Sequence, residues 1–519
     1  MMDDEADAEL EATRRYVVAA TQEIPVYADP ELAGPAFAQL APGSTLLAAE
    51  LRSDASGSLR MRIGAPNGWI DPQGLEPAPA PRPVALKWSD FEAAQGELAP
   101  GDHYGIVFPT SHEAFEEMGS AFLTQAFRAS GVLTEAQEVL RIEAYERVDS
   151  GGASITASFD AVYADPLVSG LTKAPTKLFV KMPAADVQRK FVSSHMLFGE
   201  TEFARFISNA PFPVPVSRYV FGDYCRQTTN GILITERIPF GEHPIEKAHP
   251  KGLDALLPNA EEHYRALNVG LAQIVAFHKR GGLGEELEEV FPFRAEGSFM
   301  PAPPVGGLID FITGDARHLL PDEMTTPSFV TRFQSDAEWI LANLRPLAAA
   351  LNKDVDYTGF CHANLNLDNA WFWRDEEDTL RAGLIDWGAA GQMSIGQAYY
   401  GMLFASRPER MLGLRRELVR DFVAEYERAS GIELSANALL RRAKVACLLT
   451  LPMIVFASEQ FLERYGRNEL AETRSISDAA HEQDSGFQTM FAMLGNVLME
   501  WLDPELDPLE VCRSLLGEQ

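Results

Sequence analysis

Short apolar runs separated by turn residues fill the first part of the chain and predict β-strands. The runs cover residues 16–20, 25–27, 45–51 and 59–63. Turn-forming pairs lie between them, among them Asp29-Pro30 and Pro42-Gly43. Several short strands in this stretch favour a small all-β barrel over residues 14–75. Residues 1–13 are acidic and predict a solvated tail.

After a Pro-rich stretch the pattern becomes mixed helix and strand. Residues 76–83, EPAPAPRP, have the composition of a stiff, extended linker. Residues 111–146 predict two helices, because Phe115, Met118 and Phe122 repeat at helical spacing and a second apolar group follows. That second group is Leu140, Ile142 and Tyr145. Strands are expected at 154–163, 177–182 and 231–237, and a helix at 191–207.

From residue 241 onward the periodicity is mostly helical. Apolar residues at Leu267, Leu271 and Ile274 share one helical face, and further helices are expected at 415–428, 436–463 and 487–502. We therefore expect an α+β fold with a small β-rich lobe at 84–240, including the helices that precede its strands. A large helical lobe follows at 241–519.

Composition and charge narrow the class of protein. Of the 519 residues 46% are hydrophobic and 23% charged, which excludes a wholly disordered chain. The formal charge of −31 disfavours nucleic-acid binding, which needs a positive surface. The four cysteines form no C-x-x-C pair, and the acidic start lacks a secretory signal. The longest apolar run, 445–457, is shorter than the roughly 18–20 residues of a membrane span, so we expect a cytoplasmic protein.

The residues that carry chemistry lie at 358–391. His362-x-Asn364-x-x-x-x-Asn369 precedes a short strand and an acidic loop. A second strand then ends in Asp386-Trp387-Gly388. In a kinase, one amide oxygen and one carboxylate hold Mg²⁺ on the nucleotide phosphates. Antiparallel pairing of the two strands would bring both groups to the same rim.

This segment resembles the aminoglycoside phosphotransferase and choline kinase superfamily, and within it the ecdysteroid-kinase-like group. The pattern of that group is H-G-D-x-x-x-x-N followed by I-D-[WF]. The resemblance covers residues 105–505 and implies a two-lobed protein-kinase-like fold that uses ATP or GTP. It also implies Mg²⁺ held by Asn369 and Asp386, and a small-molecule acceptor. Residues 14–75, which end near Asn67-Gly68-Trp69-Ile70, resemble a bacterial SH3-like domain, which implies a possible protein partner.

Further positions match the same family in order. Lys181, in LFVKMP, stands where the family keeps its phosphate-binding lysine, and Glu200 fits the helix glutamate that pairs with it. Glu236 ends the strand whose continuation normally holds adenine through its backbone. Gly151 and Gly152, in DSGGA, stand where a glycine-containing turn would cover the phosphates.

One departure from the family pattern bears on activity. Asn364 occupies the position of the catalytic Asp, and Ala363 replaces the preceding Gly. An amide cannot accept the proton of a hydroxyl, and general-base help contributes about 10²–10⁴ in rate. Phosphoryl transfer depends mainly on positioning and charge neutralisation, so slow chemistry is expected. The alternative is a pseudokinase that binds nucleotide or another ligand and serves a regulatory or scaffold role.

Overall fold

The structure is a computed structural model, and it forms two compact units. It describes residues 15–19, 21–41, 44–64, 66–77, 88–94, 99–148, 154–164, 174–208, 211–284, 287–294 and 303–518. The first unit comprises residues 82–246 and 383–390, and the second comprises 1–81, 247–382 and 391–519. The predicted acidic tail lies outside the described residues, as does most of the predicted linker.

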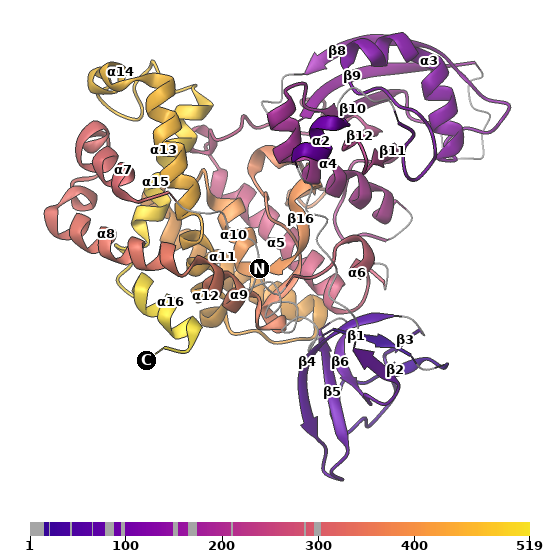
Figure 1. Ribbon diagram of the computed structural model, residues 1–519, viewed down its shortest axis with the longest axis horizontal. Coiled ribbons are helices and arrows are strands. Elements are labelled where there is room, and N and C mark those ends of the chain that lie inside the picture. The colour runs from indigo at the N-terminus through magenta and orange to yellow at the C-terminus, as the bar shows by residue number, and fades with distance from the viewer. Residues whose placement is uncertain are drawn as a thin grey trace. The chain divides into compact units, whose positions relative to one another are not determined.

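The first unit is built on a five-stranded antiparallel sheet with the order β11-β12-β10-β9-β8 (Figure 1). Its strands are β8 (Val139–Val148), β9 (Ser154–Tyr163), β10 (Lys177–Pro183), β11 (Tyr219–Cys225) and β12 (Asn230–Glu236). The strands predicted at 154–163, 177–182 and 231–237 are therefore confirmed. β10 is the central strand, and its Lys181 pairs with Thr156 on one side and Leu233 on the other.

Two helices cover opposite faces of this sheet (Figure 1). α3 (His112–Ala129) begins at Ser111, whose hydroxyl caps the helix by accepting from the amide of Ala114. Its phenylalanines share a buried cluster with Leu178, Val180 and Met182 of β10. Lys181 has the opposite parity on that strand, so it faces α4 (Val187–Ile207). The helix predicted at 191–207 is thus present and begins four residues earlier.

The second helix predicted within 111–146 is wrong. Residues 139–148 form β8, an edge strand that pairs with β9. The pairing shifts register twice, and Ala144 has φ +48° within the second shift. Bulges of this kind break the strict alternation by which a strand is recognised. The spacing of Leu140, Ile142 and Tyr145 imitated a helical face for this reason.

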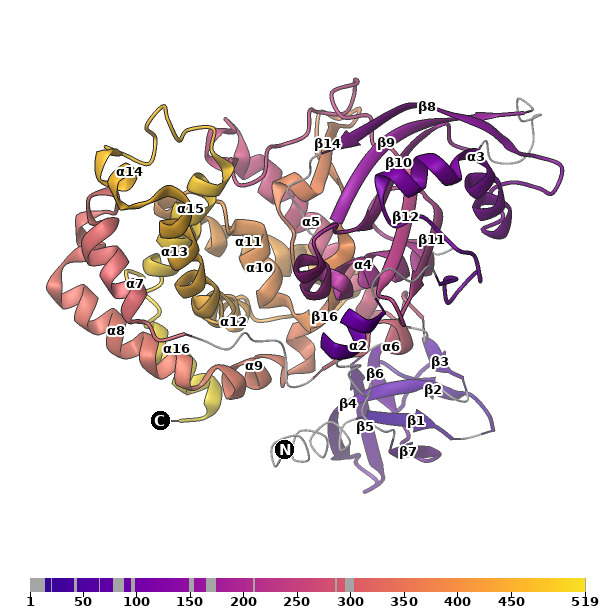
Figure 2. The ribbon, with the colours of Figure 1, turned by 45° about the horizontal axis from the view of Figure 1, so that its top comes forward.

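The second unit begins with seven strands (Figure 2). They are β1 (Arg15–Val18), β2 (Ile24–Val26), β3 (Ala38–Leu40), β4 (Thr45–Ser53), β5 (Leu59–Gly64), β6 (Asn67–Ile70) and β7 (Leu75–Pro77). Five form one sheet with the order β6-β5-β4-β1-β7, and β2 pairs with β3. Val26, Met61, Ile63 and Ile70 are buried in a common core. The predicted strands are confirmed, and the SH3-like assignment stays a prediction.

The rest of the second unit is mainly helical. Its α-helices are α5 (Ala260–Lys279), α6 (Leu287–Val290), α7 (Gly306–Asp310), α8 (Pro327–Ala342), α9 (Leu344–Asn352), α10 (Ile395–Leu403), α11 (Pro408–Ser430), α12 (Ala436–Leu448), α13 (Leu451–Tyr465), α14 (Arg467–Glu472), α15 (Ser485–Met499) and α16 (Pro508–Leu516). The predicted helix 436–463 is two helices, because Thr450 stands at the N-cap of α13 and Pro452 follows in its first turn. An antiparallel sheet with a lysine strand and a covering helix, followed by a helical part, is the element order of the protein-kinase-like fold.

The stretch 436–465 has the length and apolar composition of a membrane span, with a mean hydropathy of 1.8 in its most apolar window. In the structure 61% of that window is buried. Val445, Leu448, Leu451 and Ile454 belong to the core of the helical part. Packing within the unit is therefore sufficient to explain the apolar character of this stretch.

A cluster of charged side chains is enclosed in that helical core. Glu500 receives two hydrogen bonds from the Arg415 guanidinium and one, at 2.8 Å, from Lys444 Nζ. The Glu500 and Lys444 side chains are 0% exposed, and Asp503 lies 3.5 Å from Lys444. Such a cluster is stable only while every charge keeps its partners.

Candidate functional site

In the first unit, three charged side chains from separate elements meet. Lys181 Nζ on β10 donates to Glu200 Oε2 on α4 and to Asp386 Oδ1, the latter at 2.5 Å. The side chains of Lys181 and Glu200 are largely buried, whereas that of Asp386 is 36% exposed. The structure thus brings together three of the residues that the sequence predicted, although Asp386 lies 205 positions after Lys181 in the chain.

The backbone around Asp386 is held in an unusual conformation. Asp386 has φ +62° and ψ +54°, in the left-handed region, and a single 3₁₀ turn, η7 (Trp387–Ala389), follows it. Trp387 stacks on Phe203 of α4 with ring centroids 4.0 Å apart. Its indole N–H also donates to the carbonyl of Leu384 at 3.2 Å. These contacts fix the direction in which the Asp386 carboxylate leaves the chain.

Gly388 permits the close approach between η7 and α4. A Cβ atom added at Gly388 would lie 2.8 Å from the carbonyl oxygen of Met196. A Cβ atom added at Gly199 would lie 3.1 Å from the carbonyl oxygen of Gly388. A glycine on each side therefore lets the two backbones meet. Sequence reasoning treated Gly388 only as part of a motif and missed this packing role.

The electrostatics of the three groups keep the lysine charged. Burial alone lowers the pKa of Lys181, but the carboxylates of Asp386 and Glu200 outweigh burial and raise it. Burial also raises the pKa of Glu200, against the opposing effect of Lys181. At neutral pH the Lys181 ammonium is therefore a fixed positive charge that can meet an anion.

The second unit holds the other part of the predicted motif. β13 (Thr358–His362) leads into the loop, η6 (Leu367–Asn369) is a single turn, and β14 (Ala370–Arg374) leaves it. β14 pairs with β15 (Leu380–Leu384), and β13 pairs with β16 (Ala390–Ser394). The strands predicted at 370–373 and 382–385 are thus present, the second shifted by one or two residues. His362 is fully buried at the end of β13.

Hydrogen bonds inside the loop set the orientation of its amides. Asn369 Nδ2 donates to the backbone carbonyl of Asn364 at 2.8 Å. The Asn369 side chain is oriented so that its remaining polar atom, Oδ1, is the one able to act as an oxygen ligand. Asn366 Nδ2 donates to Asn364 Oδ1 at 2.7 Å, and Asn366 is 1% exposed. Sequence reasoning did not single out Asn366, because nothing in its type or spacing marks it.

The loop that follows β13 also packs closely against helix α10. A Cβ atom added at Gly401 would lie 2.0 Å from the carbonyl oxygen of Ala363 and 3.1 Å from the amide nitrogen of Leu365. No side chain fits between the helix and this part of the loop. Gly401 is therefore a supporting residue for Asn364, and its role depends on a tertiary contact that the sequence does not display.

The structure gives less information on the other predicted site residues, Gly151, Gly152 and Glu236. Gly151 and Gly152 lie outside the described residues. Glu236 is exposed at the end of β12, and its amide donates to the carbonyl of Arg218 at 2.9 Å. The amide of Arg237 donates to the carbonyl of Lys177 at 3.0 Å. Both N–H groups are engaged in the sheet. A backbone N–H that donates to a nucleotide base would therefore have to come from a residue after Arg237.

Asp368 stands apart from Asn364 in its electrostatic partners. It raises the pKa of Asp254, for which burial is the larger cause, to about 6. Asp254 in turn accepts from the Tyr264 hydroxyl at 2.6 Å. Asp368 therefore lies close enough to the buried Asp254 carboxyl group to act on its pKa.

No protein-family model and no curated protein matches the chain. Among solved structures, choline kinase of Cryptosporidium parvum Iowa II is similar at 12% identity and a TM-score of 0.36, covering 73% of this chain and 94% of that one. Ethanolamine kinase of Plasmodium vivax is 10% identical with a TM-score of 0.36, covering 80% and 96%. An aminoglycoside phosphotransferase of Streptomyces rimosus, solved with ADP and streptomycin, is 17% identical with a TM-score of 0.28, covering 64% and 97%.

These structures carry the names of the superfamily that the motif at 362–388 resembles.

Proposed function

We propose that this protein is a phosphotransferase that moves the γ-phosphoryl group of ATP or GTP, with Mg²⁺, to a hydroxyl group of a small molecule. The observation that carries the proposal is the contact of Lys181 with both Glu200 and Asp386. In phosphoryl transfer a lysine binds the phosphates, and a helix glutamate holds that lysine in place.

The oxygen donors of the motif suit Mg²⁺, a hard cation that prefers carboxylate and amide oxygens. Asp386 offers a carboxylate and Asn369 an amide oxygen, its nitrogen being engaged by the Asn364 carbonyl. We assign Asn369 and Asp386 as the Mg²⁺ ligands. When bound, the ion would neutralise charge on the phosphates; Lys181 would add a fixed positive charge.

Asn364 would contact the acceptor hydroxyl. Its Oδ1 is engaged by Asn366, so its Nδ2 can donate a hydrogen bond but no atom can take a proton. The amide can orient the acceptor without activating it, which favours slow transfer. The same observation supports the second candidate function, a pseudokinase that binds nucleotide and transfers nothing.

A titration of the full chain with nucleotide tests the proposal. Calorimetry with MgATP and MgGTP should show saturable binding, and Lys181→Met should weaken it at least about tenfold, as expected when a charged contact of at least about 1.4 kcal/mol is lost. Asp386→Asn should remove the dependence on Mg²⁺. Lys177→Met is the matched control, because Lys177 lies on the same strand with its side chain 51% exposed. Absence of any response to saturating Mg-nucleotide in the wild type would overturn the proposal.

Transfer itself is assayed by release of ADP or GDP in the presence of candidate acceptors. Amino alcohols and aminoglycosides form a suitable panel, since choline, ethanolamine and streptomycin occur in the names of the similar structures. Acceptor-stimulated turnover supports the phosphotransferase. Tight binding without turnover in both the wild type and Asn364→Asp supports the pseudokinase.

We also propose that the protein works in the cytoplasm. All four cysteines are unpaired and buried, which suits a reducing compartment. A protein partner for the strands of residues 15–77 stays a prediction, as does their SH3-like character.

A further inference from the structure

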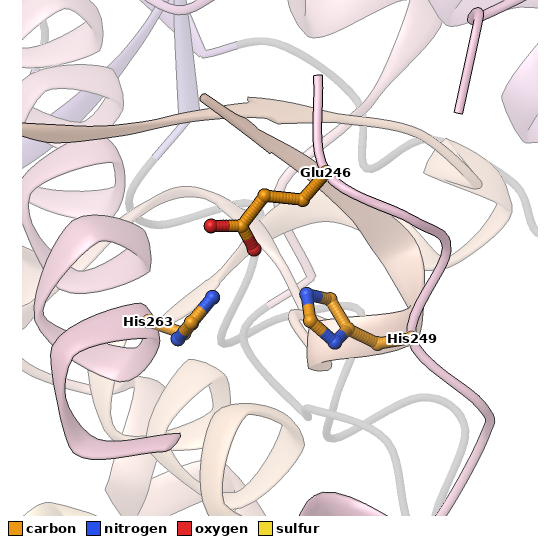
Figure 3. Close-up of side chains that lie close together, drawn as sticks. All are labelled: Glu246, His249 and His263. Carbon is orange, nitrogen blue, oxygen red and sulfur yellow. The ribbon is translucent and has the colours of Figure 1, made fainter. Parts of the chain in front are cut away.

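Three potential metal ligands converge within the continuous stretch 246–263 (Figure 3). They are Glu246 and His249, in the segment that follows β12, and His263, in the first turn or so of α5. One ligand atom from each residue lies within 4.8 Å of the other two. Figure 3 shows the carboxylate group and both imidazole rings turned toward one another.

The tautomer of His263 is set by a backbone contact. His263 Nδ1 lies 2.9 Å from the carbonyl oxygen of Asn259. A carbonyl oxygen can only accept, so Nδ1 carries the proton and donates it to this bond. Nε2 is then the ring nitrogen that can offer a lone pair to a metal ion. A hydrogen bond from the second nitrogen to a carbonyl is the arrangement by which proteins orient metal-binding histidines.

An aromatic ring holds both imidazoles in place. Phe372 of β14 meets His263 edge to face with centroids 4.6 Å apart, and meets His249 in the same way at 5.3 Å. The two imidazoles are themselves 5.0 Å apart and nearly perpendicular. His263 is 5% exposed, and Glu246 and His249 are half-buried. The donor atoms thus lie in a partly enclosed, apolar setting, which strengthens their interaction with a cation.

We propose that Glu246, His249 and His263 form a binding site for a divalent transition-metal ion, and that Zn²⁺ is the ion that binds best. Two imidazole nitrogens and one carboxylate oxygen are a donor set that suits Zn²⁺ and leaves a fourth position for water. Tetrahedral bonds of about 2.1 Å place donor atoms about 3.4 Å apart, so the three side chains would close by roughly an ångström through rotation of their χ angles. Mg²⁺ prefers an all-oxygen set and is expected to bind poorly here.

Occupation of this site would fasten residues 246–249 to the start of α5. The segment between them contains the short turn η1 (Asp254–Leu256), so a bound ion would close a loop of moderate length. Because the three ligands converge only in the folded chain, binding of the ion would stabilise the fold. The proposal is independent of the nucleotide site and holds whether or not the protein transfers phosphate.

Metal binding is measured on the full chain after treatment with a chelator. Zn²⁺ is titrated in competition with a chromophoric chelator, with excess Mg²⁺ present and no nucleotide. We expect one tight equivalent. Loss of a residue that only supports a ligand weakens metal binding roughly 10–100-fold. Loss of a ligand itself should cost more, so His249→Gln and His263→Gln should each weaken Zn²⁺ binding by more than about 100-fold. His249→Cys supplies a thiolate ligand in place of the imidazole and should retain binding.

Two neighbours serve as matched controls. Glu242→Gln and His243→Gln change the same residue types a few positions earlier, outside the cluster, and should bind Zn²⁺ like the wild type. If a histidine variant unfolds, Co²⁺ added to the wild type answers instead, since a tetrahedral nitrogen–oxygen site gives visible d–d absorption. No tight equivalent of Zn²⁺ and no such absorption in the wild type would overturn the proposal. So would unchanged affinity in a folded His249→Gln protein.

Discussion

Asn366 Nδ2 donates a hydrogen bond to Asn364 Oδ1 at 2.7 Å, and Asn366 is almost completely buried. The side chain at position 364, where the family pattern has its catalytic Asp, therefore accepts a hydrogen bond from a neutral donor. A carboxylate at position 364 would accept from the same donor, and a hydrogen bond to a charged acceptor is roughly twice as strong as a neutral one. The loop is already suited to the aspartate that the family pattern carries.

Asn364→Asp should consequently fold and gain activity. Restoring a general base is worth up to about 10²–10⁴ in turnover, and we expect a sizeable part of that factor in acceptor-dependent nucleotide hydrolysis. Basal hydrolysis serves as the assay where no acceptor is known. Nucleotide affinity is measured alongside, because the added negative charge would also act on a metal ion held by Asn369 and Asp386.

Asn366→Leu provides the companion test for this loop. It removes the donor while keeping the approximate volume, so the gain from Asn364→Asp should shrink in the double variant. Suppose instead that the wild type is fast and that neither substitution changes its rate. The acceptor would then lose its proton without help from position 364.

Gly388→Ala should weaken Mg-nucleotide binding without touching a ligand. The new Cβ would lie 2.8 Å from the Met196 carbonyl oxygen, and η7 would have to move away from α4 together with Asp386. Overpacking of this kind costs about 1–3 kcal/mol. Calorimetry should show weaker binding, and thermal unfolding should show lower stability. Gly391→Ala is the control, because its Cβ would meet only Met393 Cε, at 3.7 Å.

Glu500→Gln should destabilise the helical core strongly. It removes the carboxylate that pairs with Arg415 and leaves Lys444 only the more distant Asp503, at 3.5 Å. Breaking a buried pair typically costs about 3–5 kcal/mol. Denaturant unfolding measures the loss. Glu261→Gln breaks an exposed pair with Arg410 and should cost less than about 1 kcal/mol. Equal losses in the two variants would contradict this view of the cluster.

The same carboxylate predicts a pH dependence. Burial raises the pKa of Glu500, but Arg415 and Lys444 outweigh burial and lower it from 4.5 to about 2. A depressed pKa gives stability that is fully present above 4.5 and is lost as the pH falls toward 2. Unfolding free energies measured from pH 6 to pH 3 should therefore decline in the wild type, and this part of the decline should be absent in Glu500→Gln.

A chain that begins at Val84 should remain soluble and bind nucleotide as the full chain does. The strands of residues 15–77 contact the helical part through a polar pair, in which Arg62 donates to both carboxylate oxygens of Asp356 at 2.6 and 2.8 Å. The buried apolar residues of these strands form a core of their own, so removing the strands should leave the helical core intact. Aggregation of the shortened chain, with the full chain soluble, would show instead that these strands are part of the structural core.

The prediction of Lys181, Glu200 and Asp386 rests on the resemblance to a family pattern and on the order of the matching motifs along the chain. The structure places the charged groups of these three residues in contact. The strands at 154–163 and 231–237 were equally accessible, because short apolar runs bounded by turns predict strands directly. The local pattern of apolar residues was sufficient to predict these strands.

The features that the sequence prediction got wrong or missed have physical causes that no local sequence pattern reveals. The bulges at Ala144 displaced the alternation of β8, which made a strand resemble a helix. Gly388 and Gly401 matter because of backbones that approach them from elsewhere in the chain. Glu246, His249 and His263 offered the sequence only an E-x-x-H pair and a histidine 14 positions later, a spacing common in chains without metal. Their convergence follows from tertiary structure alone.

The contact of Lys181 with two carboxylates also fixes a charge balance. When Glu200 and Asp386 are both ionised, their charges and that of the Lys181 ammonium sum to −1, so a nucleotide arriving without a metal would meet net repulsion. A divalent ion added to the same three groups changes the sum to +1 and turns repulsion into attraction. Metal and nucleotide would then bind with positive cooperativity, each raising the affinity for the other by the same factor, as thermodynamic linkage requires. In this arrangement the Lys181 ammonium offsets the electrostatic repulsion between the two carboxylates while no divalent ion is bound.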